Sequence, residues 1–215
     1  MRLERRASGR PTFQCPRAGA HAPCRGALPH GRRGDAARCH HLRRERRTDA
    51  PSHFEAINDD TLSLRDAHCP AAKVSVLSNA TQIHREEVRR ALLRVDNNIL
   101  KLDSAFDATV RRIDNPQNPA YAVRDIVREM KRFEGRMILQ TMFLRGVCNG
   151  EPVDNTTEEE VSAWLRLVEE IRPQKVMVYS LDRDTPCPTL EKVPREELQA
   201  IAARVEALGI PCPVA

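Results

Sequence analysis

The stretch 73–104, KVSVLSNATQIHREEVRRALLRVDNNILKLDS, constrains the fold most, because its pattern reads strand, helix, strand. A short apolar run at 74–77 predicts a strand that ends at Ser78-Asn79. Thr81 is the expected helix N-cap. The period of two over 99–103 places Lys101 and Asp103 on one strand face. Helical spacing defines the apolar stripe between the strands: Val88, Ala91, Leu92 and Val95. Polar groups at both strand ends are typical of a ligand site.

The rest of the chain past residue 52 repeats this alternation of helices and apolar strands. Stripes at helical spacing predict helices at 54–68, 123–133, 157–171 and 194–208. Thr157 and Glu160 form an expected capping box at the third of these. Apolar runs predict strands at 136–145 and 175–180, and a short closing strand at 210–214. The alternation indicates an α/β fold built from parallel βαβ units with right-handed crossovers.

Loop lengths indicate which edge of the predicted sheet carries the site. The helix-to-strand links are a few residues each, whereas three strand-to-helix links are long, at 105–117, 147–156 and 181–193. In α/β sheets and barrels the loops after the strands build the site. The functional edge is therefore expected to carry Asn79, Asp103 and these three loops.

The first 52 residues differ in composition from the remainder. They hold 13 arginines, no lysine and four acids, a net charge of +9, so residues 53–215 carry −4 of the total of +5. They also contain no valine, isoleucine, tyrosine or tryptophan. Such a segment buries too little apolar surface to offset the entropy of ordering. We expect residues 1–52 to be disordered and residues 53–215 to form the folded domain.

The cysteine pattern and hydropathy indicate the compartment. Seven cysteines occur at irregular spacing, which is not a disulfide framework, and Cys148 and Cys187 are expected to be free thiols. The cysteines and histidines of the first 52 residues lack the paired spacings of a zinc site. No apolar run is long enough to span a membrane, and the N-terminus has no signal-peptide core. We expect a cytoplasmic protein with no membrane partner.

Four segments resemble a known family in their order along the chain: AKVSVLSNAT, VDNNILKLDSAFD, RRIDNPQNP and ILQTMFLRG. They are similar to the later strands of radical S-adenosylmethionine (radical SAM) enzymes, in particular a group of uncharacterised bacterial members. The resemblance covers residues 53–215 and implies a partial parallel (β/α) barrel. It also implies two cofactors, S-adenosylmethionine and a [4Fe-4S] cluster, whose reaction gives a 5′-deoxyadenosyl radical.

Two motifs of that family are missing from the chain. No cysteines have the CxxxCxxC spacing that holds the cluster, and no glycine-rich G-x-G-E segment occurs. One back-translation of residues 39–52, CHHLRRERRTDAPS, reads one base later as A-I-T-F-A-G-N-G-E-P-T-L-H, which contains that segment. The first 52 residues are therefore interpreted as an out-of-frame, non-native sequence. We expect an inactive fragment with no metal ligands and name no catalytic residue.

Lys101 and Asp103 are candidate contacts to the ribose or carboxylate of S-adenosylmethionine, by analogy with strand-end polar groups in the family. The alternative is a buried ion pair, although i, i+2 neighbours on a strand seldom pair well. Ser78 and Asn79 are candidates for the nucleoside, and their alternative is a loop cap. Arg145 is interpreted as a solvated loop charge rather than a contact to an anionic substrate, and so is Arg183.

Gln140 and Thr141 are polar residues in an apolar strand and need partners, so we expect them in the barrel interior. Tyr179, at the end of the last main strand, is a further cofactor-binding candidate, with core filling as its alternative. A different class of function is a small α/β domain whose arginine-rich arm, with Arg43 and Arg44, recruits nucleic acid. The arm has no aromatic platforms, so a nucleic-acid partner is not favoured. We expect a monomer.

Overall fold

The computed structural model describes residues 51–148, 150–182 and 187–214. Residues 1–50 of the segment expected to be disordered and non-native lie outside the described residues. Both expectations therefore stay predictions. The described residues form six helices and seven strands, in the order α1 (Pro51–His68), β1 (Ser75–Ser78), α2 (Glu86–Leu92), β2 (Asn97–Lys101), α3 (Asp107–Asp114), α4 (Val123–Lys131), β3 (Ile138–Met142), β4 (Leu144–Cys148), β5 (Glu151–Asp154), α5 (Glu158–Ile171), β6 (Lys175–Tyr179), β7 (Leu190–Lys192) and α6 (Arg195–Glu206).

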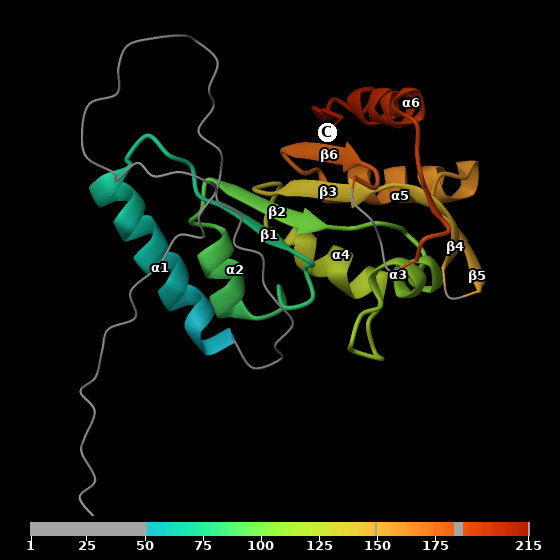
Figure 1. Cartoon of the computed structure of the whole chain (residues 1–215). Coiled ribbons are helices and arrows are strands. Elements are labelled where there is room, and N and C mark those ends of the chain that lie inside the picture. The colour runs from blue at the N-terminus through green and yellow to red at the C-terminus, as the bar shows by residue number, and fades with distance from the viewer. Residues whose placement is uncertain (1–50, 149, 183–186, 215) are drawn as a thin grey trace, which may run out of the picture. The chain divides into compact units, whose positions relative to one another are not determined.

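The main sheet is parallel and confirms the expected α/β class. Its strand order is β1-β2-β3-β6, and helices connect each strand to the next (Figure 1). In the described part of the chain β1 is one edge of this sheet. At the other edge, the expected strand at 210–214 is reduced to a bridge between Val178 and Val214, supported by a hydrogen bond from the Val176 amide to the Pro211 carbonyl.

The two faces of the main sheet carry different side chains. One face packs on the helices and belongs to the hydrophobic core, with Val76, Leu100, Leu139, Val176 and Val178 all buried. Successive strand residues point to opposite faces. The face opposite the helix-packed core, here called the inner face, therefore carries Lys101, Gln140, Met177 and Tyr179, which are half-buried. The candidate site begins on this inner face.

A second, antiparallel sheet lies beyond the carboxyl ends of the main strands (Figure 1), with strand order β5-β4-β7. The single strand expected at 136–145 is thus two strands, β3 and β4, which belong to different sheets. The break falls at Phe143, whose amide donates to the Tyr179 carbonyl of the main sheet. The next amide, Leu144, instead donates to the Asn155 side chain. Two expected loops contain the other strands of this sheet, β5 and β7.

Two local expectations about helices are corrected. The helix after β1 begins at Glu86 with Arg85 as N-cap, not at Thr81. The reason is that Asn79 Oδ1 accepts hydrogen bonds from both the amide and the hydroxyl of Thr81, which fixes a turn there. The expected loop at 105–117 contains α3, whose last residue is followed by Asn115 in the left-handed conformation. None of the described helices is long and apolar enough to cross a membrane.

The two cysteines expected to be free thiols, Cys148 and Cys187, form a disulfide. The register of β4 and β7 explains this pairing. Gly146 is opposite Leu190, and the Val147 amide donates to the Thr189 carbonyl, so the ladder brings the two cysteines together at its end. The bond joins the end of β4 to the turn that precedes β7.

Candidate functional site

A lysine between two carboxylates marks the carboxyl end of β2. Lys101 Nζ lies 2.6 Å from Oδ2 of Asp103, and it also donates a short hydrogen bond to Oδ1 of Asp114 on α3. The contact between Lys101 and Asp103 is an ion pair and not a hydrogen bond, because Oδ2 of Asp103 has no hydrogen-bond partner. The Asp103 side chain is fully buried, whereas those of Lys101 and Asp114 are 25% and 23% exposed. We call these three residues the edge triad.

Burial and charge act in opposite directions within the edge triad. Burial raises the pKa of Asp103 to about 7; the Lys101 ammonium lowers it, and the Asp114 carboxylate raises it further. For Lys101, burial alone would lower the pKa, but the two carboxylates outweigh burial and hold it above its ordinary value. Lys101 is therefore charged at neutral pH, while Asp103 changes charge near neutrality. With both carboxylates ionised the triad carries a net charge of −1.

Two tyrosines lie close enough to the edge triad to interact with its charges. Burial raises the pKa of Tyr121, and the carboxylates of Asp114 and Asp103 raise it further. Burial and the Asp103 charge likewise raise the pKa of Tyr179. Both phenols are therefore protonated at neutral pH and available as hydrogen-bond donors beside the triad.

A buried amide holds the Asp103 backbone in place. Asn155, which follows β5, donates from Nδ2 to the carbonyl oxygens of Asp103 and Met142 at 2.7 and 2.8 Å, and its Oδ1 accepts the Leu144 amide at 2.8 Å. The Met142 amide in turn donates to Oδ1 of Asp103 at 2.8 Å. The second sheet and the edge triad are therefore connected through one side chain.

The loop after Asp103 is anchored by the buried Glu160 of α5. Its carboxylate accepts hydrogen bonds from Ser104 Oγ and Thr109 Oγ1, both at 2.6 Å. The capping box expected at this helix is thus half formed: Thr157 Oγ1 accepts the Glu160 amide, while the Glu160 side chain binds α3 and its preceding loop instead. This contact fixes α3, which carries Asp114, against the end of β2.

Four of the predicted site residues lie together. Lys101 is in register with Gln140, which is in register with Met177. Asp103 and Tyr179 lie one step further along, on either side of Met142. The Gln140 side chain is half-buried on the inner face. Thr141 is not on that face: it is buried on the helix side, and its hydroxyl donates to the Leu102 carbonyl.

The other predicted residues have structural partners. Ser78 Oγ accepts the Ala80 amide, and Asn79 Oδ1 accepts the Thr81 amide, so both cap the turn after β1. Arg145, expected to be a solvated charge, forms a two-pronged ion pair with Glu197 of α6. Arg183 lies outside the described residues. Among the described residues, no three side chains of histidine, cysteine, aspartate or glutamate gather into a metal site.

Sequence reasoning missed Asp114, which falls in the expected loop at 105–117, and Tyr121, which lies between that loop and the helix expected at 123–133. The signal that identifies α3 is Asp107, followed by Val110 at helical spacing. Asp107 Oδ1 accepts the Val123 amide, and Val110 is buried. Asp114 follows Val110 by one helical turn and Asp107 by two, and it is the last residue of α3.

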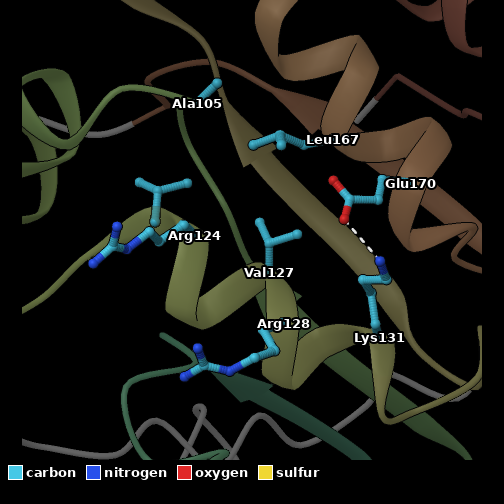
Figure 2. A pocket seen from close by; sticks show the side chains of 8 residues that line it. Ala105, Arg124, Val127, Arg128, Lys131, Leu167 and Glu170 are labelled. Atoms are coloured by element: carbon cyan, nitrogen blue, oxygen red, sulfur yellow. Dashed lines mark hydrogen bonds and ion pairs between the residues drawn. The ribbon is translucent and has the colours of Figure 1, made fainter.

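A groove of about 330 Å³ lies between α4 and α5 (Figure 2). Val123, Val127 and Leu167 form its apolar floor, and an ion pair between Lys131 and Glu170 crosses one end at 2.7 Å. Figure 2 shows the Arg124 side chain turned away from Leu167. The groove contains none of the predicted site residues.

Comparison with solved structures identifies the class of fold. A crystal structure of a domain of pyruvate-formate lyase-activating enzyme from Bacteroides vulgatus superimposes with a TM-score of 0.52 at 12% identity, over 76% of this chain and 92% of that chain. A radical SAM methyltransferase from Sphaerobacter thermophilus gives 0.53 at 15% identity, over 76% of this chain and 47% of that chain. The chain therefore has a radical SAM-like α/β fold over 76% of its length, as the sequence motifs predicted.

Sequence comparison adds no family assignment. No family model matches the chain. A protein named GTPase Obg from Brachyspira hyodysenteriae is 23% identical over 137 residues, which is 62% of this chain and 19% of that protein. The chain thus spans about a fifth of the length of that relative.

Proposed function

We propose that the chain is a fragment of a radical SAM protein that binds S-adenosylmethionine at the edge triad without cleaving it reductively. The observation that carries this proposal is the position of Lys101, Asp103 and Asp114 at the carboxyl end of β2. Ligands of parallel α/β sheets bind outside the carboxyl ends of the strands. Radical SAM-like neighbours make S-adenosylmethionine the ligand with the strongest support.

The charge of the edge triad suits a cationic ligand group. Lys101 is already shared between two carboxylates, so above pH 7, where Asp103 is ionised, the triad offers excess negative charge rather than a free cation. S-adenosylmethionine carries a sulfonium and an ammonium, and either group near Asp103 is attracted to that charge. Tyr121 and Tyr179 supply hydroxyl donors for the polar groups of the nucleoside. Gln140 on β3 and Asn79 in the turn after β1 stay candidates.

The residues of the described chain do not fit a [4Fe-4S] cluster. Such clusters need cysteine thiolates at close spacing. Of the four described cysteines, Cys148 and Cys187 are joined to each other, Cys69 is exposed at the end of α1, and Cys212 is buried near α6. We therefore infer that the chain binds S-adenosylmethionine in the cytoplasm and does not turn it over through a cluster.

Equilibrium dialysis with S-adenosylmethionine tests the proposal. The chain is expected to bind one equivalent, and Asp103→Asn is expected to weaken binding at least about tenfold, because one charge of the triad is lost. Asp60→Asn, an exposed aspartate of α1, is the matched control and should bind like the wild type. Absence of saturable binding, or equal binding by Asp103→Asn, contradicts the proposal.

A further inference from the structure

The second sheet is buried at its inner end, at Leu144 and Asn155, but lightly packed at the outer end that carries the Cys148–Cys187 disulfide. β7 has three residues, of which Glu191 and Lys192 are exposed. Val153 is the one buried residue of β5, and Val147 on β4 is 41% exposed. Regions with few buried apolar contacts open locally at low free-energy cost. A covalent bond between residues 39 positions apart therefore adds to the order of this outer end.

The second sheet is connected to Asp103 through the side chain of Asn155. Asn155 leaves β5 and holds the Leu144 amide of β4 with Oδ1, while its Nδ2 binds the Asp103 carbonyl. The Met142 amide, at the end of β3, donates to the Asp103 carboxylate. If β4 shifts when its link to the turn before β7 is lost, Asn155 loses the Leu144 amide that positions it, and Asp103 loses the support of Asn155.

We propose that the Cys148–Cys187 disulfide is a reversible cross-link, here called the tie, whose reduction and oxidation control the order of the second sheet. Through Asn155, the tie also controls the position of Asp103. Both cysteines are half-buried, so a small thiol reaches them. A disulfide in a reducing compartment is typically transient and redox-sensing rather than structural. The proposed function enters only in identifying what Asp103 does; the tie itself does not depend on it.

The reaction is thiol–disulfide exchange with a low-molecular-weight thiol of the glutathione class. One thiolate attacks one sulfur of the disulfide, forms a mixed disulfide, and releases the other cysteine as a thiolate that takes up a proton. A second thiolate attacks the mixed disulfide, frees the remaining cysteine, and leaves as part of the oxidised dimer of the reductant. Two electrons and two protons reach the protein, and the reverse reaction restores the tie.

Alkylation and amide hydrogen exchange in glutathione buffers of different ratio test this proposal. Cys148 and Cys187 are expected to resist alkylation in denatured oxidised protein and to be alkylated after reduction. Reduction is expected to speed exchange at least about tenfold at 144–155, including the Leu144 amide. Exchange over α4, residues 123–131, should not change, because the tie does not contact that helix.

Two variants separate the tie from a general effect of reductant. The double variant Cys148→Ser with Cys187→Ser is expected to exchange fast at 144–155 in both buffers. Cys69→Ser, which removes an exposed free thiol, should respond like the wild type. Alkylation of Cys148 and Cys187 in denatured oxidised protein, or equal exchange at 144–155 in both redox states, overturns the proposal. If exchange responds but S-adenosylmethionine binds in neither state, the tie stands and the proposed function fails.

Discussion

Lys101 Nζ and Asp103 Oδ2 lie 2.6 Å apart although the residues are only two positions apart in sequence. Side chains at i and i+2 of a straight strand start about 6.6 Å apart, so a contact this short needs a long side chain or a bend in the chain. The pairing is possible because β2 ends at Lys101, and Asp103 is already in the turn that Ser104 fixes by accepting the Phe106 amide. The ion pair therefore depends on the strand ending where it does.

The first prediction concerns the pH dependence of stability. The folded pKa of Asp103 is raised by burial to about 7, from an ordinary value of 3.8. Between these values the folded state holds more protons than the unfolded state, so stability falls as pH rises from 4 to 7. The slope from this one group is at most about 1.4 kcal/mol per pH unit. Urea unfolding at a series of pH values measures it.

Asp103→Asn should remove this decline, because asparagine does not titrate, while its carbonyl oxygen still accepts the Met142 amide. Asp60→Asn serves as control and should keep the wild-type slope. A decline of equal size in Asp103→Asn would falsify the assignment of the slope to this residue.

A second prediction is that Asn155→Ala costs about 3 kcal/mol of unfolding free energy. The substitution leaves the Leu144 amide and the carbonyls of Asp103 and Met142 without their partner in a buried setting. Asn118, whose side chain accepts the Ala120 amide in an exposed turn, is the matched control. Asn118→Ala should change stability by less than about 0.5 kcal/mol. Denaturant titration compares them, and equal losses would count against the role given to Asn155.

A third prediction compares two glycines of the second sheet. A Cβ added at Gly146 would lie 2.3 Å from the Thr189 carbonyl oxygen, and its φ is +130°. Gly150 has a φ of +82° but no atom within 4 Å of the added Cβ. Gly146→Ala should therefore cost about 2–4 kcal/mol, against about 1–2 kcal/mol for Gly150→Ala. Thermal unfolding ranks the two, and the reverse order would be inconsistent with the β4–β7 contact.

A fourth prediction concerns iron. Reconstitution of the purified chain with iron and sulfide should not yield four irons per chain or the broad visible absorption of a [4Fe-4S] cluster. The reason is that the cysteine spacing offers no CxxxCxxC loop, and the described cysteines are dispersed. Reproducible incorporation of four irons, lost on substitution of any cysteine, would show that a cluster site exists.

The sequence predicted the main sheet because its strands and helices follow simple periodicities. Val76, Leu100 and Val178 lie in buried strands as expected, and the radical SAM-like fold is confirmed. The second sheet was missed because its strands are short and mostly exposed. Local pattern did not reveal that Gly146 and Leu190 pair across 44 residues of chain.

The site was predicted in part. Lys101, Asp103, Gln140 and Tyr179 were identified as polar groups in or after apolar strands, and they lie near one another. Asp114 was not identified, because it approaches Lys101 only through the packing of α3 against Glu160. That packing depends on tertiary contacts over about 50 residues of sequence, which period and spacing do not encode.

The most direct test of the account compares the affinities of S-adenosylmethionine and S-adenosylhomocysteine by titration calorimetry at pH 8. The two ligands differ in the positive charge on sulfur, which the edge triad is proposed to recognise. The account predicts that the wild type binds S-adenosylmethionine at least about tenfold more tightly and that Asp103→Asn loses most of this preference. Equal affinity for the two ligands, or an unchanged preference in Asp103→Asn, would contradict it.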